Sequence, residues 1–164
     1  MGILGGTLFS LLVLVSSGSS TPEELAGRIF SAIQSNDFGA IRNLMVDTDD
    51  VAATLDHFDM DANRREKMKK SLVGKIQTDM ESTLSTIEGG FNDIQTVFSS
   101  KKCKKGVVMG TVNRNSSPVN GLPFEIGDLD IEIVCGKHVE KMTVEIIHTE
   151  TGWYILEKLR LLHP

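Results

Sequence analysis

The chain has 164 residues and a formal net charge of −5, from 17 Lys and Arg against 22 Asp and Glu. Its hydrophobic share of 40% and charged share of 24% are typical of a globular domain and exclude wholesale disorder. The acidic balance and the aromatic share of only 5% argue against a nucleic-acid partner, which usually requires a basic surface and stacking aromatic residues.

Residues 1–20 carry no charged side chain and contain an apolar run from Ile3 to Val15. The run is shorter than the roughly 20 apolar residues that a membrane-spanning helix needs. Small residues follow it over Ser16–Ser20, as they do at a signal-peptide cleavage site. We therefore predict a signal peptide over 1–20, one mature domain over 21–164, and export to a periplasm or to the extracellular space. Because no Lys or Arg precedes the run, an uncleaved anchor is the alternative.

The mature chain is predicted to begin with helices. Thr21-Pro22-Glu23-Glu24 has the pattern of a capping box with proline in the first turn, which starts a helix. Apolar residues then recur at helical spacing over Leu25–Ile33. Two shorter helices are expected over Phe38–Met45 and Thr48–Leu55.

The longest helix is predicted to begin at Asp61 and to end at Gly89-Gly90. Apolar residues recur at every fourth position along it, which places them on one face that we expect to be buried against a sheet. They are Met68, Leu72, Ile76, Met80, Leu84 and, closing the stripe, Ile87.

After Gly90 the hydrophobic period changes to two, which predicts strands. The expected strands are Ile94–Ser100, Val107–Asn113, Leu129–Cys135, Val139–Thr149 and Trp153–Leu162, with a loop over Arg114–Gly127. Helices followed by an antiparallel meander indicate an α+β fold, with the helices packed on one face of a curved sheet.

Gly136-Lys137 is expected to be the turn of a two-residue hairpin. The register that this turn sets places Glu132 opposite Lys141, and opposite charges in such pairs stabilise a sheet. The same register places the apolar side chains of both strands on one face. The hairpin is therefore supported by its turn and by its side chains.

The two cysteines, Cys103 and Cys135, are predicted to form a disulfide. An exported chain meets an oxidising compartment, where paired cysteines usually bridge. If the strand over Val107–Asn113 lies antiparallel to the one over Leu129–Cys135, the two sulfurs are brought to the same end of the pair. The alternative is a pair of separate thiols, with Cys103 activated by its lysine neighbours.

Two segments resemble those of nuclear-transport-factor-two-like domains, the superfamily with the ketosteroid-isomerase-like or cystatin-like fold. They are Ala32–Phe38 leading into Ile41, Leu44 and Met45, and Gly152-Trp153-Tyr154-Ile155 before the last strand. The resemblance implies helices that close the mouth of a strongly curved antiparallel sheet, and the cystatin-type helix-on-sheet fold is the alternative. Because members include both enzymes and domains without catalysis, the fold alone does not define the function.

We expect a non-catalytic binding domain. Its concave sheet face would hold either the helices or a small apolar ligand. The residues expected to line this face are Ile131, Ile133, Met142, Val144, Ile146, Trp153 and Ile155. One alternative is a small lyase or isomerase that acts in the same cone, and another is an assembly subunit that forms a homodimer through the sheet.

Four lysines around Cys103 form a basic cluster that could contact an acidic protein, an anionic lipid headgroup or an envelope polymer. They are Lys101, Lys102, Lys104 and Lys105. No motif for a nucleotide or catalytic nucleophile occurs, and the histidines lack metal-ligand spacing, so we expect no cofactor and no metal. Asn115-Ser116-Ser117 is a glycosylation acceptor pattern if the chain passes through a eukaryotic lumen.

Overall fold

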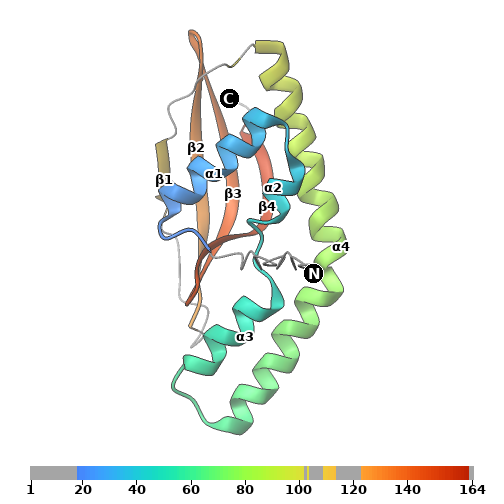
Figure 1. Ribbon diagram of the computed structural model, residues 1–164, viewed down its shortest axis with the longest axis vertical. Coiled ribbons are helices and arrows are strands. Elements are labelled where there is room, and N and C mark those ends of the chain that lie inside the picture. The colour runs from blue at the N-terminus through green and yellow to red at the C-terminus, as the bar shows by residue number, and fades with distance from the viewer. Residues whose placement is uncertain (1–17, 102, 104–108, 114–122, 163–164) are drawn as a thin grey trace, which may run out of the picture.

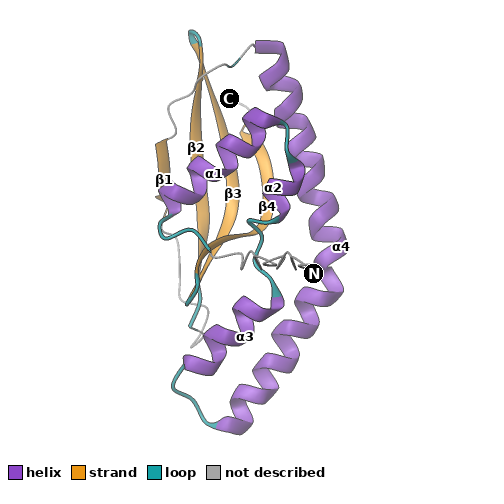
Figure 2. Cartoon of the chain, viewed as in Figure 1, coloured by secondary structure: helices purple, strands orange, loops and turns teal. Residues whose placement is uncertain are grey.

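The computed structural model describes residues 18–101, 103, 109–113 and 123–162 (Figure 1). These residues form four helices followed by four strands. The helices are α1 (Pro22–Ser35), α2 (Phe38–Arg42), α3 (Thr48–His57) and α4 (Ala62–Lys101), and the strands are β1 (Met109–Asn113), β2 (Glu125–Cys135), β3 (His138–Thr149) and β4 (Gly152–Leu162). The strands form one antiparallel sheet in the order β1-β2-β3-β4. Figure 2 shows the helices gathered beside the sheet, and the predicted α+β class is confirmed.

Side chains cap the first three helices as local sequence rules predict. The Thr21 hydroxyl accepts from the Glu24 amide at 3.1 Å, and Asp37 and Asp47 cap α2 and α3. The second half of the expected capping box differs, because the Glu24 carboxylate accepts from the Ser20 amide at 2.8 Å instead of from Thr21. The helix starts are therefore fixed locally.

Helix α4 corrects two predictions. It does not end at Gly89-Gly90, and Ile94–Ser100 belongs to this helix and not to a strand. Gly90 is the point where α4 crosses β4: a Cβ built there would lie 1.5 Å from the carbonyl oxygen of Leu159. The residue is therefore glycine because backbone approaches it, not because the helix stops. The buried residues on this half are Ile87, Phe91, Ile94 and Phe98, which recur at helical spacing.

The β2–β3 hairpin has the predicted register. Cys135 pairs with His138 across the turn, and Glu132 pairs with Lys141, whose Nζ lies 2.6 Å from Glu132 Oε1. Strand β2 begins at Glu125, so the end of the expected loop, Glu125–Gly127, is strand instead. A bulge interrupts the β3–β4 pairing next to Glu145.

Cys103 and Cys135 form the predicted disulfide, with their Cα atoms 4.4 Å apart. The bridge joins Cys103, two residues after the end of α4, to the last residue of β2. It therefore ties the C-terminal end of the long helix to the hairpin.

Two apolar clusters lie on opposite faces of the sheet. The larger contains α1, α2 and the C-terminal half of α4, with Ile146 and Ile155 from the strands. The smaller contains α3 and the N-terminal half of α4, with Ile147 and Tyr154. Neighbouring strand residues point to opposite faces, so these pairs place the clusters on the two sides of the sheet.

Two segments from the first half of the chain pair with β4. Ser19 forms an antiparallel bridge with Trp153, through hydrogen bonds of 2.8 and 3.1 Å. Met45 forms a parallel bridge with Ile155, whose amide donates to the Leu44 carbonyl at 2.8 Å. The fold therefore includes Gly18–Ser20, which precede the domain boundary expected at residue 21.

Candidate functional site: an apolar groove beside α4

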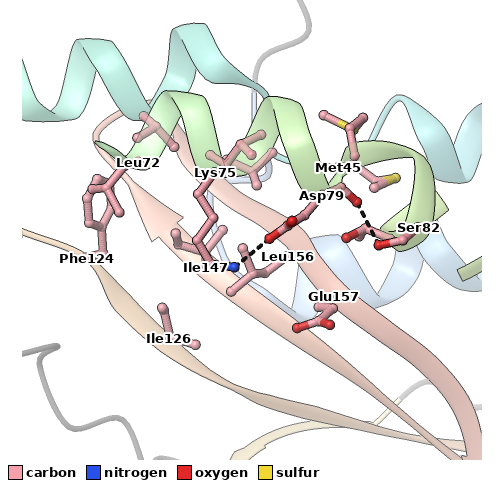
Figure 3. Close-up of a pocket in the computed structure, with 15 residues that line it drawn as sticks. Met45, Leu72, Lys75, Asp79, Ser82, Phe124, Ile126, Ile147, Leu156 and Glu157 are labelled. Atoms are coloured by element: carbon pink, nitrogen blue, oxygen red, sulfur yellow. Dashed lines mark hydrogen bonds and ion pairs between the residues drawn. The ribbon is translucent and has the colours of Figure 1, made fainter. Parts of the chain in front are cut away.

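A groove of about 330 Å³ opens between the N-terminal half of α4 and the sheet (Figure 3). Helix α4 supplies one wall through Leu72, Ile76 and Met80. The remaining apolar lining comes from the α2–α3 connection, from α3 and from the strand face that carries the smaller cluster: Met45, Val46, Val51, Phe124, Ile126, Ile147 and Leu156. The groove is thus a largely apolar surface assembled from four parts of the chain.

The groove exists because the apolar stripe of α4 is longer than the surface that covers it. Figure 1 shows the N-terminal part of α4, with α3 beside it, extending beyond the ends of the strands. Met68, Leu72 and Ile76 are consequently only partly buried. Met80 and Leu84 are also only partly buried, so the expectation that the whole stripe is buried against the sheet is wrong except at Ile87, which is 0% exposed.

Charged groups surround the mouth of the groove. Lys75 Nζ lies 2.5 Å from Asp79 Oδ2, and Figure 3 shows Glu157 on the facing strand. The hydrogen bond and charge of Asp79, with a smaller contribution from Glu157, hold the pKa of Lys75 above its usual value. One ammonium group thus faces two carboxylates.

The negative charge continues along the sheet next to the mouth. Asp128 pairs with Glu145 across β2 and β3, and Glu145 pairs with Glu157 across β3 and β4. Burial raises the pKa of Glu145, although Lys158 Nζ, 3.4 Å from Glu145 Oε2, partly opposes the rise. The rim of the groove therefore carries more negative groups than positive ones.

The concave-face residues expected from the sequence lie elsewhere. The helices cover that face, and the residues belong to the larger cluster: Ile131, Ile133, Met142, Val144, Ile146 and Ile155 are 0% exposed and Trp153 is 8% exposed. None of them lines the groove. The sequence left open whether this face holds the helices or a small apolar ligand. In the structure it holds the helices.

A polar network lies beside the smaller cluster. The Tyr154 hydroxyl donates to Asp50 Oδ1 at 2.7 Å, and the Thr151 hydroxyl donates to the same oxygen at 2.6 Å. The Gly18 amide donates to the Tyr154 oxygen at 2.8 Å. Burial raises the pKa of Tyr154, and the hydrogen bond to Asp50 adds to the rise. Neither Tyr154 nor Asp50 lines the groove.

Several predicted features lie outside the described residues. They are the signal segment up to residue 17, the basic cluster of Lys102, Lys104 and Lys105 with the side chain of Lys101, and the acceptor residue Asn115. Cys103 and Cys135 are joined to each other, so neither is a free thiol.

Sequence reasoning missed the groove because its walls come together only in the fold. Phe124 and Ile126 stand at the end of a stretch assigned to a loop, and Val51 was assigned only to a short helix. The available signal was the length of the stripe on α4, which exceeds what one sheet face can cover.

Comparison with known proteins gives no match: no protein-family profile, no curated protein and no solved structure resembles the chain significantly. Helices packed on an antiparallel sheet are a generic arrangement, so the nuclear-transport-factor-two-like resemblance stays a prediction. Within the described part of the chain, no helix combines the length and apolar character required to cross a membrane.

Proposed function

We propose that the chain is an exported, non-catalytic binding domain, and that the groove beside α4 holds a small apolar molecule whose polar end is neutral or cationic. The observation that carries this proposal is the groove of about 330 Å³ with its mainly aliphatic lining. Ligand pockets usually have volumes of about 300–1,000 Å³ and are mostly apolar, with a few polar groups that orient the ligand.

The charges at the mouth argue for the kind of polar end. Lys75 is already paired with Asp79, so it offers little attraction to an anionic headgroup. Glu157 adds negative charge at the groove, whereas Glu145, its partner on β3, is itself paired with Lys158. An anionic ligand would meet repulsion there, whereas a neutral or cationic group would not.

The paired cysteines support the export part of the proposal. Disulfides persist in oxidising compartments and are rare in reducing ones. The bridge between Cys103 and Cys135 and the uncharged apolar segment before the domain are both compatible with a secreted or periplasmic protein. A signal peptide accounts for both observations.

The position of the polar network favours binding over catalysis. Tyr154 and Asp50 are the pair of residues that an isomerase acting in an apolar cone would use, and they lie outside the groove. The ionisable groups that line the groove are Lys75, Asp79 and Glu157, and the side chains of Lys75 and Asp79 are 73% and 45% exposed.

Fluorescence titration with two naphthalene dyes tests this proposal. Neutral N-phenyl-1-naphthylamine should bind at least about tenfold more tightly than anionic 1-anilinonaphthalene-8-sulfonate, because only the second carries a negative charge to the rim. Ile76→Gln, which places an amide in the groove wall, should weaken binding of the neutral dye at least about tenfold.

Val139→Gln is the matched control, because Val139 is apolar but 53% exposed on β3 and outside the groove. Circular dichroism confirms that both variants are folded. Equal binding of the neutral dye to wild type and Ile76→Gln would contradict the groove as the site. A dimer in sedimentation that binds no neutral dye would contradict a small ligand.

A further inference from the structure

Residues Gly18–Ser20 are part of the folded domain. Ser19 is 0% exposed, exchanges two backbone hydrogen bonds with Trp153, and accepts from Arg28 Nη1 at 3.1 Å through its hydroxyl. Removing Ser19 would leave these backbone groups of Trp153 and the Arg28 donor without that partner. The domain therefore has a structural need for the chain from Ser19 onward.

Gly18 occupies a place that only glycine fits. A Cβ built on it would lie 2.7 Å from the Tyr154 ring and 2.9 Å from the Gly152 Cα, and the second contact is with backbone. Its nitrogen donates to the Tyr154 hydroxyl oxygen at 2.8 Å. The position thus holds a nitrogen donor and excludes a side chain.

Asp50 lies at the other end of this hydrogen-bond chain and is 9% exposed. Its Oδ1 accepts from Tyr154 and Thr151, and its Oδ2 accepts from the Asp47 amide at 3.3 Å as part of the α3 capping box, but none of the ion pairs that the described residues form includes Asp50. A buried carboxylate normally has a partner of opposite charge. The Tyr154 hydroxyl is hydrogen-bonded both to the Gly18 nitrogen and to the Asp50 carboxylate.

The sequence allows more than one cleavage site. Serine is the residue before the cut if the chain is cleaved after Ser16, Ser17, Ser19 or Ser20, and small residues are accepted at that position. Cleavage after Ser19 or Ser20 would remove the bridge to Trp153 and the donor at Gly18. Cleavage after Ser16 or after Ser17 keeps both, and of these two only cleavage after Ser17 turns the Gly18 nitrogen into an amine.

We propose that the Ser17–Gly18 peptide bond is the processing site, and that the new α-amino group of Gly18 remains beside Tyr154 as the charged partner of Asp50. Hydrolysis breaks the C–N bond: the hydroxyl of water joins the Ser17 carbonyl carbon and a proton joins the Gly18 nitrogen. The amine then takes a second proton from solvent, because α-amino groups have a pKa of about 7.7–8.0. This proposal rests on the export part of the proposed function and is independent of the ligand in the groove.

The charged amine has more hydrogen-bond donors than the amide of the uncut chain, and it carries a positive charge. An amide nitrogen has one N–H, which donates to the Tyr154 oxygen. An ammonium keeps that bond, has two further donors, and carries a charge within the distance of about 4–6 Å at which opposite charges favour ionisation. Processing would therefore strengthen the interactions that hold the first residues of the mature chain against the domain.

The processing site is tested on the full chain recovered from the exported fraction of a secreting host, by intact mass and N-terminal sequencing. A first residue of Gly18 supports the proposal. A first residue of Ser17, Ser19, Ser20 or Thr21 overturns it and leaves export standing. A chain that retains Met1 overturns both.

The role of the amine is tested on the mature chain that begins at Gly18, prepared by a protease that leaves this residue first. Acetylation of Gly18 removes the charge but keeps an N–H, and we expect it to lower Tm by about 2–4 °C. Asp50→Asn should abolish this difference. Asp49→Asn, an exposed neighbour in the same helical turn, should leave it unchanged. An equal fall in Asp50→Asn and wild type, or no fall in wild type, overturns the pairing.

A second measurement does not depend on the folding of Asp50→Asn. The rate at which acetic anhydride modifies the Gly18 amine is followed by peptide mass mapping. We expect a rate at least about tenfold lower in the native protein than in the denatured protein, since a paired ammonium is a poor nucleophile. Equal rates overturn the proposal.

Discussion

The two halves of α4 carry similar apolar stripes but have different surroundings. In the C-terminal half, Ile87, Phe91, Ile94 and Phe98 are at most 6% exposed, because the sheet and α1 enclose them. In the N-terminal half, Leu72 and its neighbours on the stripe have α3 on one side and stay partly exposed. Periodicity therefore identifies the apolar face of a helix, whereas burial depends on what the fold places opposite. The part left uncovered is the candidate site.

The largest loss of stability is expected from a substitution in the C-terminal half of α4, at the point where it crosses β4. Gly90→Ala should cost more than about 4 kcal/mol, because the new Cβ meets the Leu159 carbonyl oxygen, and backbone cannot move aside as a flexible side chain can. Chemical denaturation measures the loss.

Gly89→Ala is the matched control, one residue away on the same helix. A Cβ at Gly89 meets nothing within 4 Å, so alanine should stabilise the helix by about 0.5–1 kcal/mol. Similar effects of the two substitutions would mean that α4 does not cross β4 at Gly90.

Replacement of both Cys103 and Cys135 by serine should cost about 3–4 kcal/mol, since the bridge closes a loop with a sequence separation of 32 residues. The same variant tests whether dye binding beside the N-terminal half of α4 depends on the bridge at its C-terminal end. The bridge holds the C-terminal half, so dye binding in the groove should change less than about twofold under conditions in which the variant is folded. A large loss of dye binding would show that the groove depends on the closed half.

The two halves should also respond differently to the same truncation. Ile94→Ala should cost about 3 kcal/mol, because Ile94 is 0% exposed. Ile76→Ala should cost about 1 kcal/mol, since Ile76 is only partly buried and a groove already lies beside it. Equal losses in denaturant titrations would mean that the N-terminal half is as closed as the C-terminal half.

The smallest expected effect is the pH dependence of stability that Glu145, on β3 beside the groove, confers. Burial raises the pKa of Glu145 above its ordinary value of 4.5, so the folded state holds this proton more tightly than the unfolded state does. The resulting stability is fully present below pH 4.5 and is lost as pH rises through the folded pKa. Glu145→Gln should therefore gain stability relative to wild type over this rise, by at most about 1 kcal/mol.

Denaturant titrations at a series of pH values measure this difference. Glu81→Gln, an exposed change on α4, should follow the wild-type profile. Parallel profiles for Glu145→Gln and wild type would contradict the desolvation of Glu145.

The features that could be predicted from the sequence are those that depend on neighbouring residues. Thr21 identifies the start of α1 through a side chain three residues from its partner, and Gly136-Lys137 sets the register of the hairpin. The disulfide prediction followed from an expected antiparallel pairing of Val107–Asn113 with Leu129–Cys135, which β1 and β2 have, and from an oxidising compartment.

The features that could not be predicted depend on contacts between distant parts of the chain. Gly90 has the sequence signature of a helix stop, and only the approach of Leu159 explains it. The groove needs Ile126 and Leu156 opposite Ile76, and Asp50 meets Tyr154 only in the folded chain. No local pattern records these contacts.

The bridges that Ser19 and Met45 form with β4 also affect how the chain behaves among its own copies. The outer edge of a last strand normally offers unpaired N–H and C=O groups, which another chain can use to extend the sheet. Here Ser19 pairs with Trp153, the Leu44–Val46 segment pairs with Ile155, and Gly90 lies against the Leu159 carbonyl. A strand from another molecule could add to β4 only after these segments had detached, so the contacts that build the fold also protect this edge from aggregation.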